Sequence, residues 1–354
     1  ILINDGLIAM EVTELRRDEI VCRVTDGGLL TNKKGVNVPD ISLNMPYLSP
    51  ADMQDLEFGA SHDFDFIAAS FVRTAGDVIY LRNFCQALGW NDVRIIAKIE
   101  NMEGVNNIDA IIEEADGIMV ARGDMGVEIP FEQIPSVQKQ LIRKGYQAGK
   151  QVVVTATQML ESMITNPRPT RAEITDVANA IYDGTSAIML SGETAMGAHP
   201  VEAVQTMASI AATTEEDIDY KVRFSNVYPA PLTKNITSAI GHATVTTAHD
   251  LGAAAIVTVT QSGTTARMIS KYRPDVPIIG ATTEEKVLHQ LMLSWGVVPV
   301  RCVRQDNTDA LFDHAVEVGR TTGLIHPDDI VVITAGIPLG ASGTTNMLKV
   351  QTVR

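Results

Sequence analysis

The 354-residue chain is poor in cysteine and in basic residues, and each shortage excludes a class of protein. Cys22, Cys85 and Cys302 lie far apart and are odd in number, which argues against a disulfide framework and favours a reducing cytoplasm. Lys and Arg number 28 against 43 Asp and Glu, a net charge of −15, so neither nucleic acid nor an anionic membrane is expected as a partner. The sequence shows no signal peptide, no membrane-spanning apolar run and no metal-ligand spacing among its seven histidines.

The first 37 residues have the pattern of an all-β segment. Ile1–Ile3, Leu7–Val12 and Ile20–Val24 are apolar or β-branched runs separated by glycine-containing or charged turns. This segment is too small for a stable domain, so we expect it to be the end of a larger one. Because the chain opens at Ile1, inside a predicted strand and without methionine, we also expect the natural protein to extend upstream.

From about residue 47 the chain alternates apolar strands with amphipathic helices. Strand starts recur about every 24–35 residues, the length of a βα unit. Five such units in a row predict a parallel sheet, most economically five strands of a (β/α)8 TIM-type barrel. Five strands cannot close that barrel, which again indicates missing upstream sequence. The predicted strands are Phe64–Phe71, Val93–Ile99, Gly117–Ala121, Gln151–Ala156 and Ser186–Leu190.

A second α/β pattern follows a charged, proline-containing segment and predicts a separate open-sheet domain. The sequence therefore predicts four regions: the end of a small β domain (1–37), five barrel units (38–213), a linker (214–236) and a C-terminal α/β domain (237–354). The strands expected in the last region are Ala255–Val259, Pro277–Ile279, Val297–Val303, Ile330–Thr334 and Met347–Val353.

Polar and ionisable side chains follow every predicted barrel strand, where active sites of such barrels lie. In the second strand, Ile96, Lys98 and Glu100 share one face, and a buried charged pair is costly unless it is paired or bound to a ligand. A solvated edge pair is the alternative, but it leaves the other four polar strand ends unexplained. We therefore expect a functional site at this edge of the sheet.

The residue types at these strand ends indicate the chemistry. Glu100 and Asp124 are oxygen ligands suited to Mg²⁺ or Mn²⁺, which keeps positions open for substrate oxygens. Lys98 supplies a positive charge for an anion that develops during reaction. Gly123 and Gly126 allow backbone amides to approach a carboxylate or phosphate closely.

Two hydroxyls and a carboxylate complete the set. Thr157 and Ser191 could relay a proton, and Glu193 shares a strand face with Ser191. From the residues alone, this is a metal-assisted site for a small anionic substrate that passes through an enolate-like or phosphoryl-transfer transition state.

Several motifs together resemble the pyruvate kinase family in order and spacing, and the similarity covers essentially the whole chain. The resemblance implies phosphoryl transfer from phosphoenolpyruvate to ADP in glycolysis, giving pyruvate and ATP, by a cytoplasmic homotetramer. The motifs are Ile95–Val105, Met119–Asp124, Ala156–Met163, Pro167–Glu173 and Met189–Thr194.

The resemblance also implies a role for each site residue. Lys98 would stabilise the enolate and the transferring phosphoryl group, Glu100 and Asp124 would hold Mg²⁺ or Mn²⁺, and Ser70 would contact phosphate. The backbone amides of Gly123 and Asp124, with Thr157, would bind the substrate carboxylate. Thr157, Ser191 and Glu193 belong to the region implied to deliver a proton to the enolate.

Family membership would explain the abnormal start of the chain. The family's barrel is interrupted after its third strand by a small β domain that closes as a lid, so residues 1–37 resemble the end of that lid. The three preceding strands would carry the K⁺ ligands and much of the ADP site, so we expect the chain alone to be inactive. Pro167–Glu173 resembles a subunit contact of the tetramer; a solvated helix start is the alternative.

The second domain resembles the family's regulatory domain. Thr260, Gln261, Ser262, Gly263 and Thr265 leave a strand and open a helix, a geometry that favours phosphate, so we expect a sugar-phosphate or nucleotide effector there. Gly336–Gly343 would form a second wall. The chain departs from members that bind fructose 1,6-bisphosphate, because Leu311–Asp313 stands near the place of an expected arginine.

Two other functions fit parts of this pattern. A metal-dependent lyase or aldolase barrel acting on pyruvate enolate would also use paired carboxylates and a divalent ion. A truncated, non-catalytic chain would retain only effector-binding and assembly surfaces.

Overall fold

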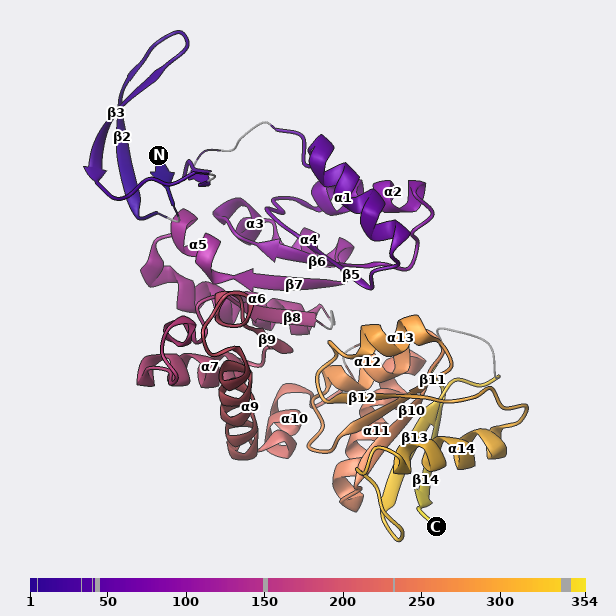
Figure 1. Cartoon of the computed structure of the whole chain (residues 1–354). Coiled ribbons are helices and arrows are strands. Elements are labelled where there is room, and N and C mark those ends of the chain that lie inside the picture. Colours follow the sequence, from indigo (N-terminus) through magenta and orange to yellow (C-terminus); the bar gives the residue numbers. More distant parts are fainter. Residues whose placement is uncertain are drawn as a thin grey trace. The chain divides into compact units, whose positions relative to one another are not determined.

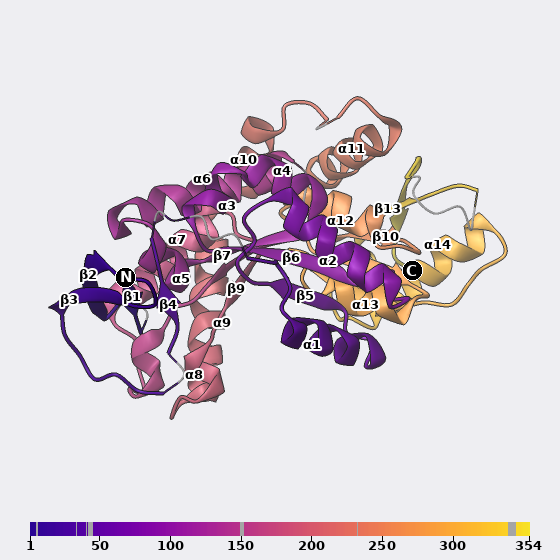
Figure 2. The ribbon, with the colours of Figure 1, turned by 90° about the horizontal axis from the view of Figure 1, so that it is seen from above.

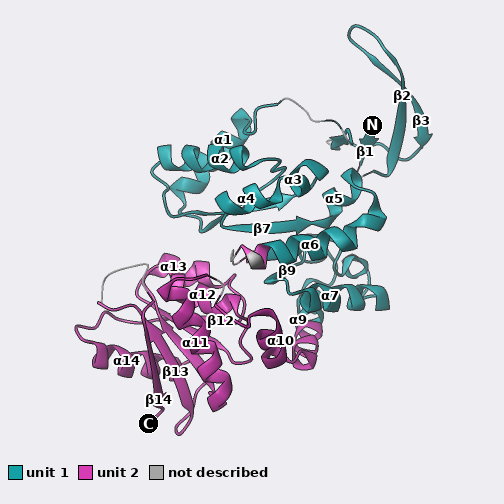
Figure 3. Cartoon of the chain, turned by 180° about the vertical axis from the view of Figure 1, so that it is seen from behind, with its two compact units in different colours: residues 1–144, 153–208 teal, residues 145–152, 209–354 magenta. Residues whose placement is uncertain are grey.

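The computed structural model describes residues 1–4, 6–32, 34–39, 41, 45–148, 152–231, 233–338 and 345–354. The chain divides into two compact units, Ile1–Lys144 with Val153–Ala208, and Gly145–Val152 with Ser209–Arg354 (Figure 3). The described residues form three sheets.

The first sheet is antiparallel, with the strand order β3-β2-β1-β4. Its strands are β1 (Leu2–Ile3), β2 (Ile8–Leu15), β3 (Ile20–Asp26) and β4 (Val36–Asn37), and β2 and β3 form a long hairpin (Figure 1). Most of this hairpin is exposed, and Ile8 is its buried apolar residue. A sheet with so little core cannot be stable alone. That it is the end of a larger β domain stays a prediction.

The second sheet is parallel and has the order β5-β6-β7-β8-β9; Figure 2 shows its strands β5, β6 and β7 from above. Every residue of β7 and β8 is buried, as expected for strands covered by helices on both faces. Consecutive strands lie side by side, so their carboxyl ends meet at one edge. The strands are β5 (Phe66–Ala69), β6 (Arg94–Ile99), β7 (Gly117–Ala121), β8 (Val152–Ala156) and β9 (Ala187–Met189).

Local signals set the helix boundaries around this sheet. Ser49 and Asp52 form a capping box before α1, and Thr170 and Glu173 form the predicted one before α7, which ends at left-handed Gly184. The helices are α1 (Pro50–Ser61), α2 (Ala75–Ala87), α3 (Met102–Asn106), α4 (Ile108–Glu114), α5 (Arg122–Glu128), α6 (Ile134–Gln147), α7 (Arg171–Asp183), α8 (Gly192–Ala195) and α9 (Pro200–Asp217); η1 (Phe131–Gln133) and η2 (Glu161–Ile164) are 3₁₀ turns.

The third sheet has the order β12-β11-β10-β13-β14, with β14 antiparallel to its neighbour. Side chains of β10 alternate between two cores: Ile256 packs on one face, and Ala255 and Val257 pack on the other. The strands are β10 (Ala255–Val259), β11 (Ile278–Thr282), β12 (Val297–Arg301), β13 (Ile330–Ala335) and β14 (Met347–Thr352); the helices are α10 (Tyr220–Val227), α11 (Ile236–Leu251), α12 (Thr264–Lys271), α13 (Glu285–Leu291) and α14 (Thr308–Arg320).

The predicted fold class is confirmed: five parallel barrel-type strands, a C-terminal open sheet and a small β remnant. Two local expectations are wrong. The helix expected near 103–115 breaks at Asn107, the C-cap of α3, and the expected linker 214–236 contains α10 because Phe224 is buried in the core of the second unit. The four domain boundaries stay predictions. Within the described residues, no helix is long and apolar enough to cross a membrane.

Candidate functional site

The charged pair predicted on β6 lies at the carboxyl end of the parallel sheet and is closely paired. Glu100 is fully buried, and its Oε1 lies 2.6 Å from Lys98 Nζ. Its Oε2 accepts a 2.5 Å hydrogen bond from the Phe71 backbone N–H. Lys98 Nζ also donates to Ser70 Oγ at 3.0 Å. The structure therefore brings together three predicted residues, Ser70, Lys98 and Glu100, from the ends of two neighbouring strands.

Burial controls the protonation of Glu100. Loss of water raises the pKa of this carboxyl; Lys98 and the Phe71 N–H lower it, and the charge of Asp124 raises it again. The net direction is upward, because a fully buried carboxylate is poorly solvated. A bound cation would relieve this penalty.

The donor set fits a hard divalent cation held by few protein ligands. Glu100 and half-buried Asp124 both offer carboxylate oxygens, and the charge of Asp124 acts on Glu100. Among the residues that the structure describes, no cluster of three or more His, Cys, Asp or Glu side chains could hold a metal ion. Substrate oxygens and water would therefore have to complete the coordination, as is usual for Mg²⁺ at substrate sites.

A strained turn follows β8 and carries another predicted residue. Thr157 and Gln158 adopt positive φ values of 71° and 54°, a region that residues with a side chain rarely occupy. Buried Arg122 fixes this turn by donating to Thr157 O at 2.7 Å and Gln158 O at 3.3 Å, while it pairs with Asp176 at 2.7 Å. Such strain persists where the surroundings hold it, and it is typical of functional sites.

Sequence reasoning did not assign Arg122 to the site. The available signal is its position directly after the wholly buried strand β7. A buried guanidinium requires several acceptors, and the turn at Thr157 provides two of them.

Gly123 and Thr157, both predicted to bind a substrate carboxylate, contact each other. The Gly123 N–H donates to Thr157 Oγ1 at 2.7 Å, and that hydroxyl donates to Ala156 O at 2.6 Å. A Cβ atom at position 123 would lie 3.2 Å from Thr157 Oγ1, which explains why glycine suits this close approach.

Ser191 and Glu193 lie at the turn after β9. Glu193 is buried and accepts hydrogen bonds from Leu160 N at 3.1 Å and Ser191 N at 2.7 Å, so its carboxylate ties two loops together. Ser191 Oγ is buried and has no hydrogen-bond partner among the described residues. This unsatisfied hydroxyl is suited to a ligand or water, while Glu193 is already engaged.

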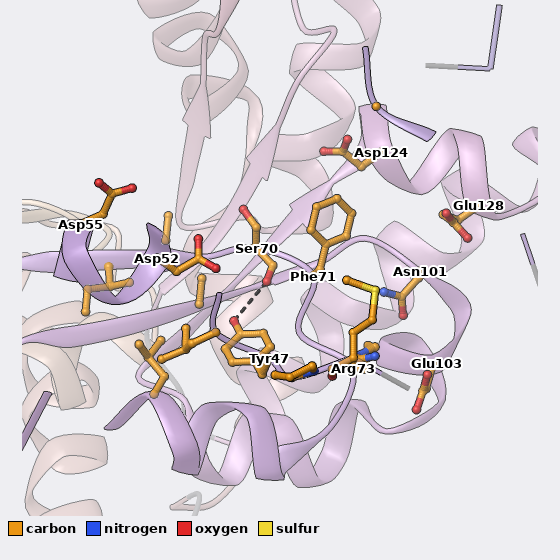
Figure 4. Close-up of a pocket in the computed structure, with 18 of the residues that line it drawn as sticks. Tyr47, Asp52, Asp55, Ser70, Phe71, Arg73, Asn101, Glu103, Asp124 and Glu128 are labelled. Carbon is orange, nitrogen blue, oxygen red and sulfur yellow. Dashed lines mark hydrogen bonds between the residues drawn. The ribbon is translucent and has the colours of Figure 1, made fainter. Parts of the chain in front are cut away.

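A cavity of about 1120 Å³ opens beside this edge of the sheet, on the side of β5 (Figure 4). Ser70, Phe71 and Asp124 line it, together with Tyr47 and Arg73. The cavity reaches Ser70, the phosphate-contact candidate, and Asp124, one of the two metal-ligand candidates, so it could admit a small anionic substrate. Lys98 and Glu100 are not among the residues that line it.

The predicted effector residues occupy the turn between β10 and α12. Gly263 has a φ of 78°, and Arg267 Nη2 donates to Ser262 O at 2.7 Å. A side chain of α12, the helix that follows the turn, therefore stabilises the turn. The Thr265 hydroxyl is buried against that of Thr345 at 2.8 Å. Thr260 is buried and Gln261 is exposed.

Other hydroxyls of this turn also contact each other, since Ser262 Oγ lies 2.9 Å from Thr264 Oγ1. Of the second wall expected at Gly336–Gly343, residues 339–343 lie outside the described part of the chain.

Comparison with known proteins gives one consistent family. Residues 1–204 match the family model for the pyruvate kinase barrel domain, and residues 238–351 match that for the pyruvate kinase alpha/beta domain. Curated pyruvate kinases from Clostridium acetobutylicum, Bacillus licheniformis and Geobacillus stearothermophilus are 49%, 52% and 52% identical over the whole of this chain. The chain spans 74%, 60% and 60% of their respective lengths.

Proposed function

Because the chain belongs to the pyruvate kinase family, we propose that it transfers the phosphoryl group of phosphoenolpyruvate to ADP, giving pyruvate and ATP in glycolysis. The observation that carries this proposal is the buried Glu100, held between Lys98 Nζ and the Phe71 N–H at the carboxyl end of a parallel sheet. Asp124 lies close enough for its charge to act on Glu100.

We propose that Glu100 and Asp124 hold Mg²⁺ or Mn²⁺. The ion, when bound, would act as a Lewis acid on substrate oxygens. It would also offset the burial that raises the pKa of Glu100 and so keep this carboxyl ionised at neutral pH. A K⁺ requirement remains an expectation from the family alone.

Lys98 is the group that stabilises charge in this proposal. The Lys98 side chain is 22% exposed, so its charge is partly shielded from water, and its ammonium lies between Glu100 and Ser70. Ser70, which accepts a hydrogen bond from this ammonium, lines the cavity. A fixed cation stabilises a developing enolate and a transferring phosphoryl group without reorganisation during the step. Ser70 contacts the phosphate in the same arrangement.

The substrate carboxylate would bind at the strained turn after β8. The Gly123 N–H, now bonded to Thr157 Oγ1, can exchange this partner for a carboxylate oxygen, and the Thr157 hydroxyl can do the same. We propose that Thr157 and the unsatisfied Ser191 hydroxyl relay a proton from solvent to the enolate, so that each hydroxyl regains the proton it gives. Glu193 orients Ser191 through its backbone N–H.

Regulation and assembly are proposed on family membership. We propose that the turn at Thr260–Thr265 binds a sugar phosphate or nucleotide. Calorimetry with fructose 1,6-bisphosphate and with AMP would test this assignment, and absence of binding heat with both ligands would remove it. Pro167–Glu173 is proposed to contact a second subunit in a homotetramer, and sedimentation would distinguish tetramer from monomer.

The reaction is tested by following pyruvate and ATP separately from phosphoenolpyruvate, ADP and Mg²⁺. Equal formation of both supports the proposal, whereas pyruvate-enolate chemistry without ATP would indicate a lyase or aldolase. A chain that binds effectors without turnover would be a non-catalytic assembly module.

In the full-length enzyme, Lys98→Met should lower kcat by about 10²–10³, because one stabiliser of the developing charge is lost. Lys139→Met provides a matched control, since the Lys139 side chain is exposed and its ammonium pairs with Asp183 at the end of α7. Retained turnover in Lys98→Met would remove Lys98 from its assigned role.

A further inference from the structure

The peptide group between Ser70 and Phe71 is held from both sides. Its N–H donates to Glu100 Oε2 at 2.5 Å, and its carbonyl oxygen accepts a 3.0 Å hydrogen bond from the Tyr47 hydroxyl (Figure 4). Tyr47 precedes α1 and is remote in sequence from β5, so tertiary structure alone brings it to this peptide.

The backbone at this peptide is strained. Phe71 has a φ of 53°, in the left-handed region that a bulky residue seldom adopts, and its side chain is 51% exposed. With half of the residue exposed, packing of the ring is a weak constraint on this conformation. The two hydrogen bonds are therefore the contacts that can maintain it.

The orientation of this peptide determines what Glu100 and Ser70 can do. A flipped peptide would turn the Ser70 carbonyl oxygen towards the Glu100 carboxylate, which repels it, and would remove the N–H that helps to keep Glu100 ionised. It would also move Ser70, whose hydroxyl accepts from Lys98 Nζ at 3.0 Å.

We infer that Tyr47 is a positioning residue of the catalytic site: its hydroxyl fixes the Ser70–Phe71 peptide in the orientation that serves Glu100 and Lys98. The phenol is suited to this task, since burial raises its pKa and it remains a donor over the whole neutral range. The expected effect of Tyr47 on catalysis rests on the proposed function, whereas its effect on the orientation of the Ser70–Phe71 peptide does not.

Hydrogen exchange of the Phe71 amide, followed by NMR on the 354-residue chain, tests the inference. In the unaltered chain this amide should exchange slowly despite the exposed ring. Tyr47→Phe keeps the ring and removes the hydroxyl, so exchange at Phe71 should become about tenfold faster, the effect of one lost hydrogen bond. Tyr80→Phe makes the same change at an exposed tyrosine of α2 and should leave the Phe71 amide unaltered.

Three outcomes would overturn the inference. They are fast exchange at Phe71 in the unaltered chain, unchanged exchange in Tyr47→Phe, and an equal effect of Tyr80→Phe. The first needs no variant, so the inference is falsifiable even if Tyr47→Phe fails to fold. In the turnover assay, Tyr47→Phe should lower kcat more than it raises KM for phosphoenolpyruvate. Turnover is measured in the full-length enzyme, because the chain alone is expected to be inactive. If the unaltered full-length enzyme does not turn over, the proposed function fails, while the exchange result still decides the role of Tyr47.

Discussion

Asp116 offers a sharp test of how the parallel sheet is held together at the end opposite the site. Its carboxylate, directly before β7, accepts three hydrogen bonds: from Ile95 N at 3.0 Å, Arg94 Nη1 at 2.8 Å and Arg82 Nη2 at 2.9 Å. These donors belong to β6 and α2. One carboxylate therefore joins two strands and a covering helix.

Asp116→Asn should destabilise the chain by about 2–3 kcal/mol at pH 7. Hydrogen bonds to a charged acceptor contribute about 1.5–3 kcal/mol each, but asparagine retains one acceptor oxygen. The two arginines are about one-third exposed, so water compensates for part of the loss. Urea unfolding measures the difference, and turnover of the folded variant should be unchanged because the amino ends of barrel strands serve stability.

The difference in unfolding free energy between the parent chain and Asp116→Asn should depend on pH in a defined direction. Burial alone would raise the pKa of Asp116, but the Ile95 N–H and the two arginines outweigh it and hold the pKa below the ordinary value of 3.8. The stabilisation is therefore present above that value and is lost as pH falls through the folded-state pKa. The gap between parent and variant should be full at pH 7 and should close towards pH 3.

Asp109→Asn is the matched control. Its carboxylate is 75% exposed and pairs with Lys144, so its loss should change stability by less than about 1 kcal/mol. An Asp116→Asn effect no larger than this, or one that stays constant between pH 7 and pH 3, would refute the reasoning.

Two further predictions concern the site. Mn²⁺ affinity, measured by electron paramagnetic resonance, should rise as pH increases above 4.5, because the raised pKa of Glu100 delays the ionisation of this carboxyl. Glu100→Gln should weaken Mn²⁺ binding and flatten the pH dependence. Unchanged affinity in this variant would exclude Glu100 as a ligand. Arg122→Lys should lower kcat by about 10²-fold in the folded enzyme, since lysine cannot hold both carbonyls of the Thr157–Gln158 turn. It should also lower the urea midpoint, because the buried guanidinium pairs with Asp176 as well. The exposed Arg143→Lys should change neither quantity, and equal kcat values for Arg122→Lys and its parent would contradict the positioning role.

Much of the fold was accessible from local pattern. β7 was predicted with its observed bounds, and the capping box at Thr170 marks the start of α7, because both depend on a few consecutive residues. The break at Asn107 and the helix α10 were not predictable in this way. Burial of Phe224 against the second unit's core stabilises a segment whose charged, proline-containing surroundings indicate a linker.

Residue order and spacing were enough to identify the family, the sheet type and the strand ends at which ionisable groups gather. The contacts that those groups make depend on the folded chain. It paired Lys98 with Glu100, engaged Glu193 with two loop amides and brought Tyr47 and Arg122 to peptides far away in sequence. Such contacts join separate segments, and a linear pattern carries no information about which buried donor will meet which acceptor.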